Sequence, residues 1–153
     1  MTPDWRFARF DELSPRDLYD ILQLRTEVFV MEQDCVFQDM DGVDTDGWHL
    51  FARVDGRIVA YCRFLAAGVK FDEPSIGRVV TAMPLRGTGL GRLLMVEAIR
   101  RGRELWPGAA IRIGAQQRLE RFYQSLGFAT DSEPYDEDGI PHVEMRLGPG
   151  GAS

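Results

Sequence analysis

Cysteine, histidine and lysine are all scarce in this chain. Among its 153 residues there are two cysteines and two histidines, and Lys70 is the only lysine. Cys35 and Cys62 do not have the spacing of metal ligands, and we expect both to be reduced thiols. No metal site is predicted.

Long apolar runs are also missing. Nowhere do about 18 apolar residues follow one another, and the first residues contain no apolar stretch of signal length. We therefore expect a cytoplasmic protein with no membrane partner. The formal net charge of −6 argues against nucleic-acid binding, because that requires a basic surface to displace counterions from phosphate. A negative field of this kind would favour a cationic amine as substrate.

What the chain does contain fits a single α/β domain. Apolar residues make up 44% of it, enough for a core at this length, and no linker or internal repeat divides the chain. We predict one domain over residues 1–147 and a flexible tail over residues 148–153.

Hydrophobic patterns predict a mixed sheet with helices on both faces. Ser14 and Pro15 mark a helix start, and Asp55-Gly56 predicts a hairpin between two alternating runs. A strand, a helix and a strand then follow and should form a parallel β-α-β unit. The expected strands are 5–10, 48–54, 57–65, 76–81, 110–114, 128–131 and 142–147, the helices 15–32, 90–105 and 119–126, and the main loops 33–47 and 133–141.

A glycine-rich loop separates the fourth expected strand from the second helix. Gly87, Gly89 and Gly91 stand at every second position, which lets successive backbone N–H groups turn inward at the start of a helix. An anion, most simply a pyrophosphate, would fit there. The dinucleotide fingerprint fails because the third glycine comes one residue early, and the nucleoside-triphosphate loop fails because Gly91 is not followed by Lys-Ser/Thr.

The remaining pattern, Arg-x-x-Gly-x-Gly after a strand, resembles the acetyl-coenzyme A pyrophosphate loop of the GNAT superfamily of acyltransferases. Segment 119–128 resembles the second part of that signature, Tyr-x-x-x-Gly-Phe, with one apolar helix face and Gly127 where a left-handed residue would end the helix. Segments 24–33, 39–42 and 135–142 resemble the ElaA-like branch. The likeness stops at residue 148, and Met83 stands where a proline is usual, with Pro84 displaced by one.

The resemblance implies a three-layer α/β/α fold with a mixed, splayed central sheet and acetyl-coenzyme A as co-substrate. Backbone N–H groups at the splay would hold the acetyl carbonyl, the glycine loop the pyrophosphate, and Gln116 a pantetheine amide. The implied coenzyme-binding residues are Val79, Val80, Thr81, Arg86, Gly87, Thr88, Gly89, Leu90, Gly91, Arg92, Gln116 and Tyr123.

Acyl transfer from a thioester to an amine requires a base, a stabilised oxyanion and a proton for the thiolate. Tyr123 is the implied acid, because a reference pKa of about 10 keeps it protonated while a thiol ionises near about 8.5. An ordinary core aromatic residue would show the same pattern. Glu144 and Glu32 are the candidate bases, acting through water, although either could be a plain surface residue.

Four further residues are expected at the acceptor site. Arg25 lies on the face that the first helix should bury, so its guanidinium must find a carboxylate, a carbonyl or the rim of a pocket. Arg78 poses the same question inside a strand. We group Gln33 and His142 with them, the latter on the strand face that it shares with Glu144.

The aspartate-rich stretch 34–46 is expected to be a solvated, turn-rich loop that could act as a lid over the acceptor. A calcium site is not expected, because Val43 stands where an EF-hand loop requires an oxygen ligand.

These features together predict an N-acetyltransferase that moves an acetyl group from acetyl-coenzyme A to a primary amine by direct attack on the thioester. The acceptor could be a small-molecule amine, a protein N-terminus or a lysine. An open strand edge could pair two subunits into a homodimer. A non-catalytic acetyl-coenzyme A sensor and a nucleotide-binding enzyme are the alternatives.

Overall fold

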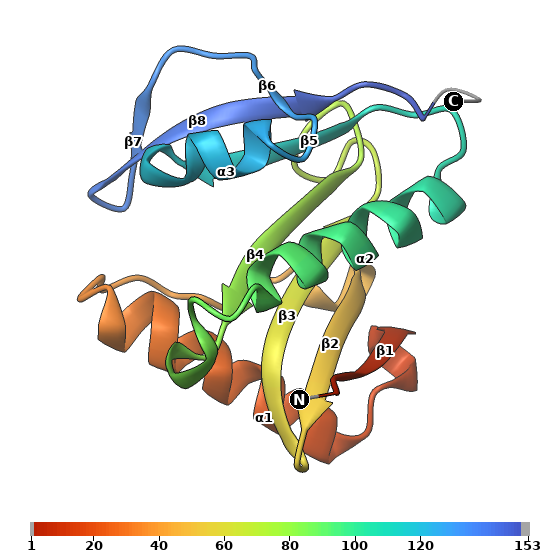
Figure 1. The fold of residues 1–153 in the computed structure, drawn as a ribbon, viewed down its shortest axis with the longest axis vertical. Helices are drawn as coiled ribbons and strands as arrows, with labels where there is room; N and C mark the ends of the chain where they lie inside the picture. Colours follow the sequence, from red (N-terminus) through yellow and green to blue (C-terminus); the bar gives the residue numbers. More distant parts are fainter. Residues whose placement is uncertain (1, 151–153) are drawn as a thin grey trace.

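The computed structural model describes residues 2–150 and shows one mixed sheet flanked by helices (Figure 1). The strands are β1 (Asp4–Arg9), β2 (Trp48–Val54), β3 (Arg57–Leu65), β4 (Ser75–Thr81), β5 (Ile111–Gln116), β6 (Ala129–Thr130), β7 (Tyr135–Glu137) and β8 (Ile140–Leu147). The helices are α1 (Pro15–Arg25), α2 (Leu90–Leu105) and α3 (Glu120–Gln124). A π-helical segment, Thr26–Glu32, continues α1.

The strand order is β1-β2-β3-β4-β5-β8-β6, and β7 pairs with β8 at one end. All neighbours are antiparallel except β4 and β5, which are parallel. This arrangement confirms the predicted α/β fold with a mixed sheet and a β-α-β unit around α2.

Local signals explain where the first elements begin and turn. The Ser14 hydroxyl accepts a hydrogen bond from the Asp17 N–H at 3.0 Å, with proline at the first helical position, as the N-cap prediction requires. Asp55 and Gly56 both have positive φ angles of 51° and 80°, the backbone of a two-residue hairpin turn. Both predictions are confirmed.

Two hydrophobic clusters lie on opposite faces of the sheet, because neighbouring strand residues alternate between them. Leu50 of β2 packs with α2 and α3, whereas the next residue, Phe51, packs with α1. Buried Leu94 and Met95 anchor α2, and each contributes about 1.5–3 kcal/mol by leaving water. The three layers of the prediction are therefore present.

The sheet splays between β4 and β5. Only Ser75 and Arg112 are paired there, and Figure 1 shows the two strands diverging from that point. β4 also carries a bulge: Tyr61 pairs with Val80 but Arg63 with Gly77, so β4 has one residue more than β3 over this stretch. Arg78, inside the bulge, has a φ of 51°. The predicted splay is confirmed.

Several details differ from the sequence-based expectations. The expected loop 133–141 contains β7 and a tight turn in which Asp138 and Gly139 have φ angles of 52° and 83°. The aspartate stretch is only partly the solvated loop that was expected: Asp34, Asp41 and Asp46 are exposed, but Asp39 and Asp44 are buried. In the predicted tail, the Gly148 carbonyl accepts a hydrogen bond from Arg103 at 2.8 Å. Residues 151–153 lie outside the described part of the chain.

Candidate active site

The glycine loop presents an open backbone cradle at the start of α2. Gly87 and Gly89 have φ angles of 81° and 86°, which glycine adopts without the steric cost of a side chain. A Cβ built on Gly87, Gly89 or Gly91 would meet no atom within 4 Å. Gly89 is the N-cap of α2 and has no side chain to occupy the free N–H groups, and the first turn of α2 contains no acidic residue. These features favour an anion.

The end of β4 lies beside this loop. Val79, Val80 and Thr81 follow the bulge, and beyond the Ser75–Arg112 pair the described part of the chain has no β4–β5 pairing. The main chain of these residues is therefore not engaged by β5. The Thr81 carbonyl accepts a hydrogen bond from Arg86 at 3.3 Å, which links the splayed strand to the loop.

Arg86 of the loop is held by a candidate base. Its guanidinium makes a two-point ion pair with Glu32 at the end of the π-helical segment, one contact being Nη2–Oε2 at 2.7 Å. The hydrogen bonds from Arg86 lower the pKa of Glu32, and the carboxylate raises the pKa of Arg86. The pair is partly exposed, with 39% of the Arg86 side chain and 26% of the Glu32 side chain accessible.

Tyr123, the predicted acid, is a residue of the hydrophobic core. It is 5% exposed and packs edge-on against Phe122 and Phe128, with ring centroids 5.2 and 5.9 Å apart. Burial raises the pKa of Tyr123 above its usual value. The side chain is therefore protonated at neutral pH, as a proton donor must be.

The second candidate base, Glu144, lies toward the closed end of the splay. Its carboxylate accepts a hydrogen bond from Arg112 at 3.0 Å, and Arg112 is the residue at which β5 meets β4. Arg112 also contacts Glu73 and Asp131. An open depression here is lined by Phe71, Asp72, Glu73, Arg112, Asp131 and Glu144.

Polar residues bridge the open end of the splay on the α1 side of the sheet. Gln116 at the end of β5 donates a hydrogen bond to Gln33 after the π-helical segment, at 3.3 Å. His142 is paired with Gln116 across β5 and β8. Its Nδ1 lies 2.7 Å from the Ile140 carbonyl, and its ring stacks on Tyr135. The structure thus brings Gln116, assigned to the coenzyme, close to Gln33 and His142, which were assigned to the acceptor; these roles stay predictions.

Arg118 was not predicted from the sequence. Its Nε donates to Gln116 at 3.0 Å. Its positive charge adds to the larger effect of Arg86 in lowering the pKa of Glu32, and it opposes the effect of burial on Tyr123. It therefore lies near both candidate catalytic groups. Its place between Gln116 and Tyr123, just before the signature segment 119–128, was the available signal.

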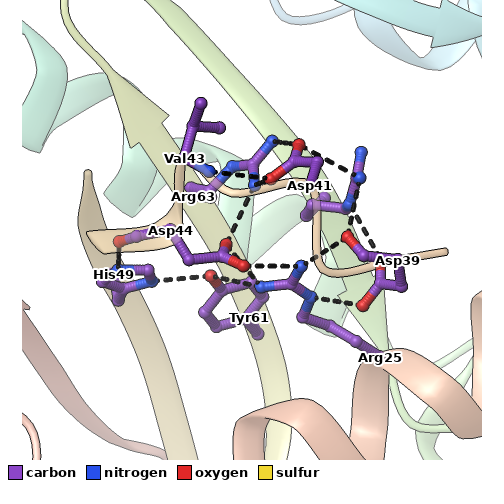
Figure 2. Close-up of polar contacts among 9 residues, drawn as sticks. Arg25, Asp39, Asp41, Val43, Asp44, His49, Tyr61 and Arg63 are labelled. Atoms are coloured by element: carbon purple, nitrogen blue, oxygen red, sulfur yellow. Dashed lines mark hydrogen bonds and ion pairs between the residues drawn. The ribbon is translucent and has the colours of Figure 1, made fainter. Parts of the chain in front are cut away.

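The two arginines assigned to the acceptor site are instead tied to aspartates, as Figure 2 shows for Arg25. Arg25 is 1% exposed, and its guanidinium contacts Asp39 and Asp44, both at 2.8 Å. A direct contact between Arg25 and an acceptor does not fit this burial, so that prediction is corrected. Arg78 contacts Asp39 at 2.8 Å. Of the open alternatives for Arg25, carboxylates and a carbonyl are observed, because its Nη2 also donates to the Asp39 backbone carbonyl at 3.1 Å.

Comparison with known proteins places this geometry in a family. Residues 14–148 match the family model described as "Acetyltransferase (GNAT) domain", and the chain belongs to the GNAT acetyltransferases. It is an acyltransferase, and the fold implies an acyl-coenzyme A co-substrate, which suits the open glycine loop.

Particular relatives narrow this class to the ElaA-like branch. Protein ElaA of Escherichia coli is 41% identical over 93% of this chain and 94% of that protein. The crystal structure of E. coli ElaA has a TM-score of 0.90 at 39% identity, covering 95% of this chain and 99% of ElaA. An acyl-CoA N-acyltransferase from Pseudomonas aeruginosa has a TM-score of 0.92 at 41% identity, covering 96% and 100%.

Two negative findings apply to residues 2–150. No helix there is long and apolar enough to cross a membrane. No group of three or more His, Cys, Asp or Glu side chains in that range could hold a metal ion.

Proposed function

We propose that the protein is an N-acetyltransferase that transfers acetyl from acetyl-coenzyme A to a primary amine by direct attack on the thioester. The observation that carries this proposal is the continuity of three features. An open anion cradle at the start of α2 lies next to the end of β4 that is not paired with β5. The Gln33–Gln116 hydrogen bond bridges the open end of the splay beyond it.

Binding is assigned to the loop and the splayed strand. The backbone of residues 86–92 would hold the pyrophosphate at the positive end of α2. The main chain of Val79–Thr81 would receive the pantetheine arm and the acetyl carbonyl, and Gln116 would hold a pantetheine amide. When bound, the thioester supplies an activated acetyl group.

Tyr123 is the proposed proton donor. Its raised pKa lies above that of a thiol, so complete proton transfer is unfavourable until negative charge has developed on sulfur. Its hydroxyl therefore acts mainly by donating a hydrogen bond to the developing thiolate. The aromatic contacts with Phe122 and Phe128 fix the ring for this role.

Glu32 is the proposed base, acting through water. It lies at the open end of the splay, next to Gln33, and a glutamate carboxylate is ionised at neutral pH. Glu144 is less suitable, because it sits toward the closed end and is already paired with Arg112. For Glu32 to take a proton from the amine, Arg86 must turn from it toward the pyrophosphate.

The test is thiol release from acetyl-coenzyme A with a panel of primary amines. We expect amine-dependent release that falls about tenfold or more in Tyr123→Phe and coenzyme binding that is lost in Gly89→Glu. Gly108→Glu is the matched control, because Gly108 also has a positive φ and open space around its Cβ but follows α2. Binding without release for any amine would favour the non-catalytic sensor, and no binding at all would refute the proposal.

A further inference from the structure

Six charged side chains form a cluster between the end of α1 and the sheet, which we call the arginine–aspartate network (Figure 2). Four of them are buried, Arg78 is partly buried, and Asp41 lies at the exposed edge. Its members come from α1, β3, β4 and the segment between the π-helical turn and β2: Arg25, Arg63, Arg78, Asp39, Asp41 and Asp44. Three positive and three negative groups balance each other. The network is therefore neutral, as burial requires.

The contacts join the aspartate segment to the sheet at several points. Arg63 donates to Asp41 at 2.8 and 2.9 Å and to Asp44 at 2.9 Å. Burial alone would raise the pKa of Asp41, but the hydrogen bonds from Arg63 prevail and lower it to about 2. Asp41 is therefore ionised at neutral pH, and the segment is fastened to β3 by charge-assisted hydrogen bonds.

Arg78 is where the network reaches the splayed strand. Its Nε donates to Asp39 Oδ1 at 2.8 Å and its Nη2 to the Asp39 carbonyl at 3.0 Å. The same residue occupies the bulge of β4 with a φ of 51°, a conformation uncommon for residues other than glycine. Gly77, which could adopt this backbone without strain, is the preceding residue and does not have a positive φ.

We propose that Arg78 is a positioning residue whose tether to Asp39 holds the β4 bulge, and so directs the main chain of Val79–Thr81 toward the thioester. This inference rests on the proposed function. The tether acts through the backbone, because the guanidinium itself is engaged by Asp39 and Asp41 of the network. The aspartate segment then serves as a support for the oxyanion and pantetheine contacts, in place of the predicted lid.

Two probes separate the strand from the glycine loop. Acetyl-coenzyme A engages both, whereas adenosine 3′,5′-bisphosphate carries phosphates without the pantetheine arm and reports on nucleotide binding alone. In Asp39→Asn and Arg78→Gln we expect kcat to fall about tenfold or more, because small misplacements of reacting groups are costly. Affinity for acetyl-coenzyme A should also fall, while affinity for the bisphosphate stays within about twofold, since no phosphate contact changes.

Arg78→Gly distinguishes positioning from simple stabilisation. Glycine adopts the positive φ freely, so the bulge is permitted although the tether is lost, and we expect kcat between those of the wild type and Arg78→Gln. A role confined to ion pairing predicts that the two variants are equally impaired. Arg53→Gln is the matched control: Arg53 is also partly buried and paired with two aspartates, but it lies on β2. It should lower the melting temperature without changing kcat.

Three results would overturn the inference. Asp39→Asn and Arg78→Gln could keep kcat within about twofold of the wild type while losing stability, or Arg78→Gly could be no better than Arg78→Gln. Loss of bisphosphate binding in parallel with acetyl-coenzyme A would show a general collapse of the site. If Arg78→Gln does not fold, the kcat and affinity values of Arg78→Gly and Asp39→Asn test the inference instead. A wild type that binds neither probe would instead refute the proposed function, which separates the two failures.

Discussion

The protein uses the same chemical pair, arginine with carboxylate, in two places of opposite character. In the arginine–aspartate network, Arg25 is 1% exposed and every member has its partners within the protein. At the glycine loop, the Arg86–Glu32 pair is accessible to solvent and lies where a phosphate is expected. Burial makes the first pair permanent, because an unpaired charge there would be very costly. Exposure makes the second pair exchangeable with a ligand.

Removing Arg25 should give the largest difference in stability between the buried network and the exposed pair. We expect Arg25→Met to lower the free energy of unfolding by about 3 kcal/mol or more, because Asp39 and Asp44 lose a partner in a buried setting. Urea denaturation followed by circular dichroism measures this. Arg86→Met is the matched control and should cost less than about 1 kcal/mol. Equal losses in the two variants would show that burial does not separate the pairs.

The exposed pair is probed by Glu32→Gln. With its carboxylate neutralised, Arg86 is free for phosphate, and we expect coenzyme A to bind about threefold more tightly or better. Without its base, the enzyme should lose about a hundredfold in kcat. Isothermal titration calorimetry and steady-state rates measure the two effects. Glu97→Gln, on the outer part of α2, should change neither quantity. A weaker affinity for coenzyme A would contradict the exchange of partners.

The free energy of unfolding should depend on pH through Asp41 of the arginine–aspartate network. The pKa of Asp41 is lowered to about 2 in the folded protein, compared with about 3.9 unfolded. Its contribution is therefore fully present above about pH 4 and is lost as the pH falls toward about 2. After allowance for solvent screening we expect about 1 kcal/mol. Asp41→Asn should flatten the pH dependence of unfolding in this window, and an unchanged profile would contradict the assignment.

The ion pairs of Arg100 on α2 represent the exposed end of the series. Arg100 contacts Glu97 and Glu104 at 2.6 Å, and 54% of its own side chain is accessible to solvent. We expect Arg100→Ala to leave the urea midpoint unchanged within experimental error, because exposed pairs of this kind contribute little. A shift comparable to that of Arg25→Met would mean that surface charge pairs on α2 matter for the fold.

Elements with a local signal could be predicted from the sequence. Ser14-Pro15 and Asp55-Gly56 determine a helix start and a hairpin turn through contacts between neighbouring residues. The Asp138-Gly139 turn carried the same kind of signal, but Pro141 and the surrounding acidic residues concealed the short strand β7. The π-helical segment has an apolar pattern that does not differ from that of an ordinary helix.

The arginine–aspartate network could not be predicted, for a physical reason. Its contacts join residues 14 to 39 positions apart, and only the completed sheet brings them together. Arg63 gave no signal, since it occupies an ordinary position in the alternating pattern of β3. The site followed the same rule: the glycine loop was evident locally, whereas the link from Arg86 to Glu32 spans 54 positions.

Because β4 and β5 are paired at one position in the part of the chain that the structure describes, the two halves of the sheet are joined by backbone hydrogen bonds at one end and not at the other. At Ser75 and Arg112 the two halves share a hinge, and toward the other end no backbone ladder in the described residues restrains them. There the halves are connected by side chains: Gln116 with Gln33, and the Cys35 thiol with the Asp138 carbonyl at 3.1 Å. These two side-chain contacts connect the halves of the sheet at the end where β4 and β5 are unpaired. The width of the opening at this end therefore depends on these side chains as well as on the shared core beneath the sheet.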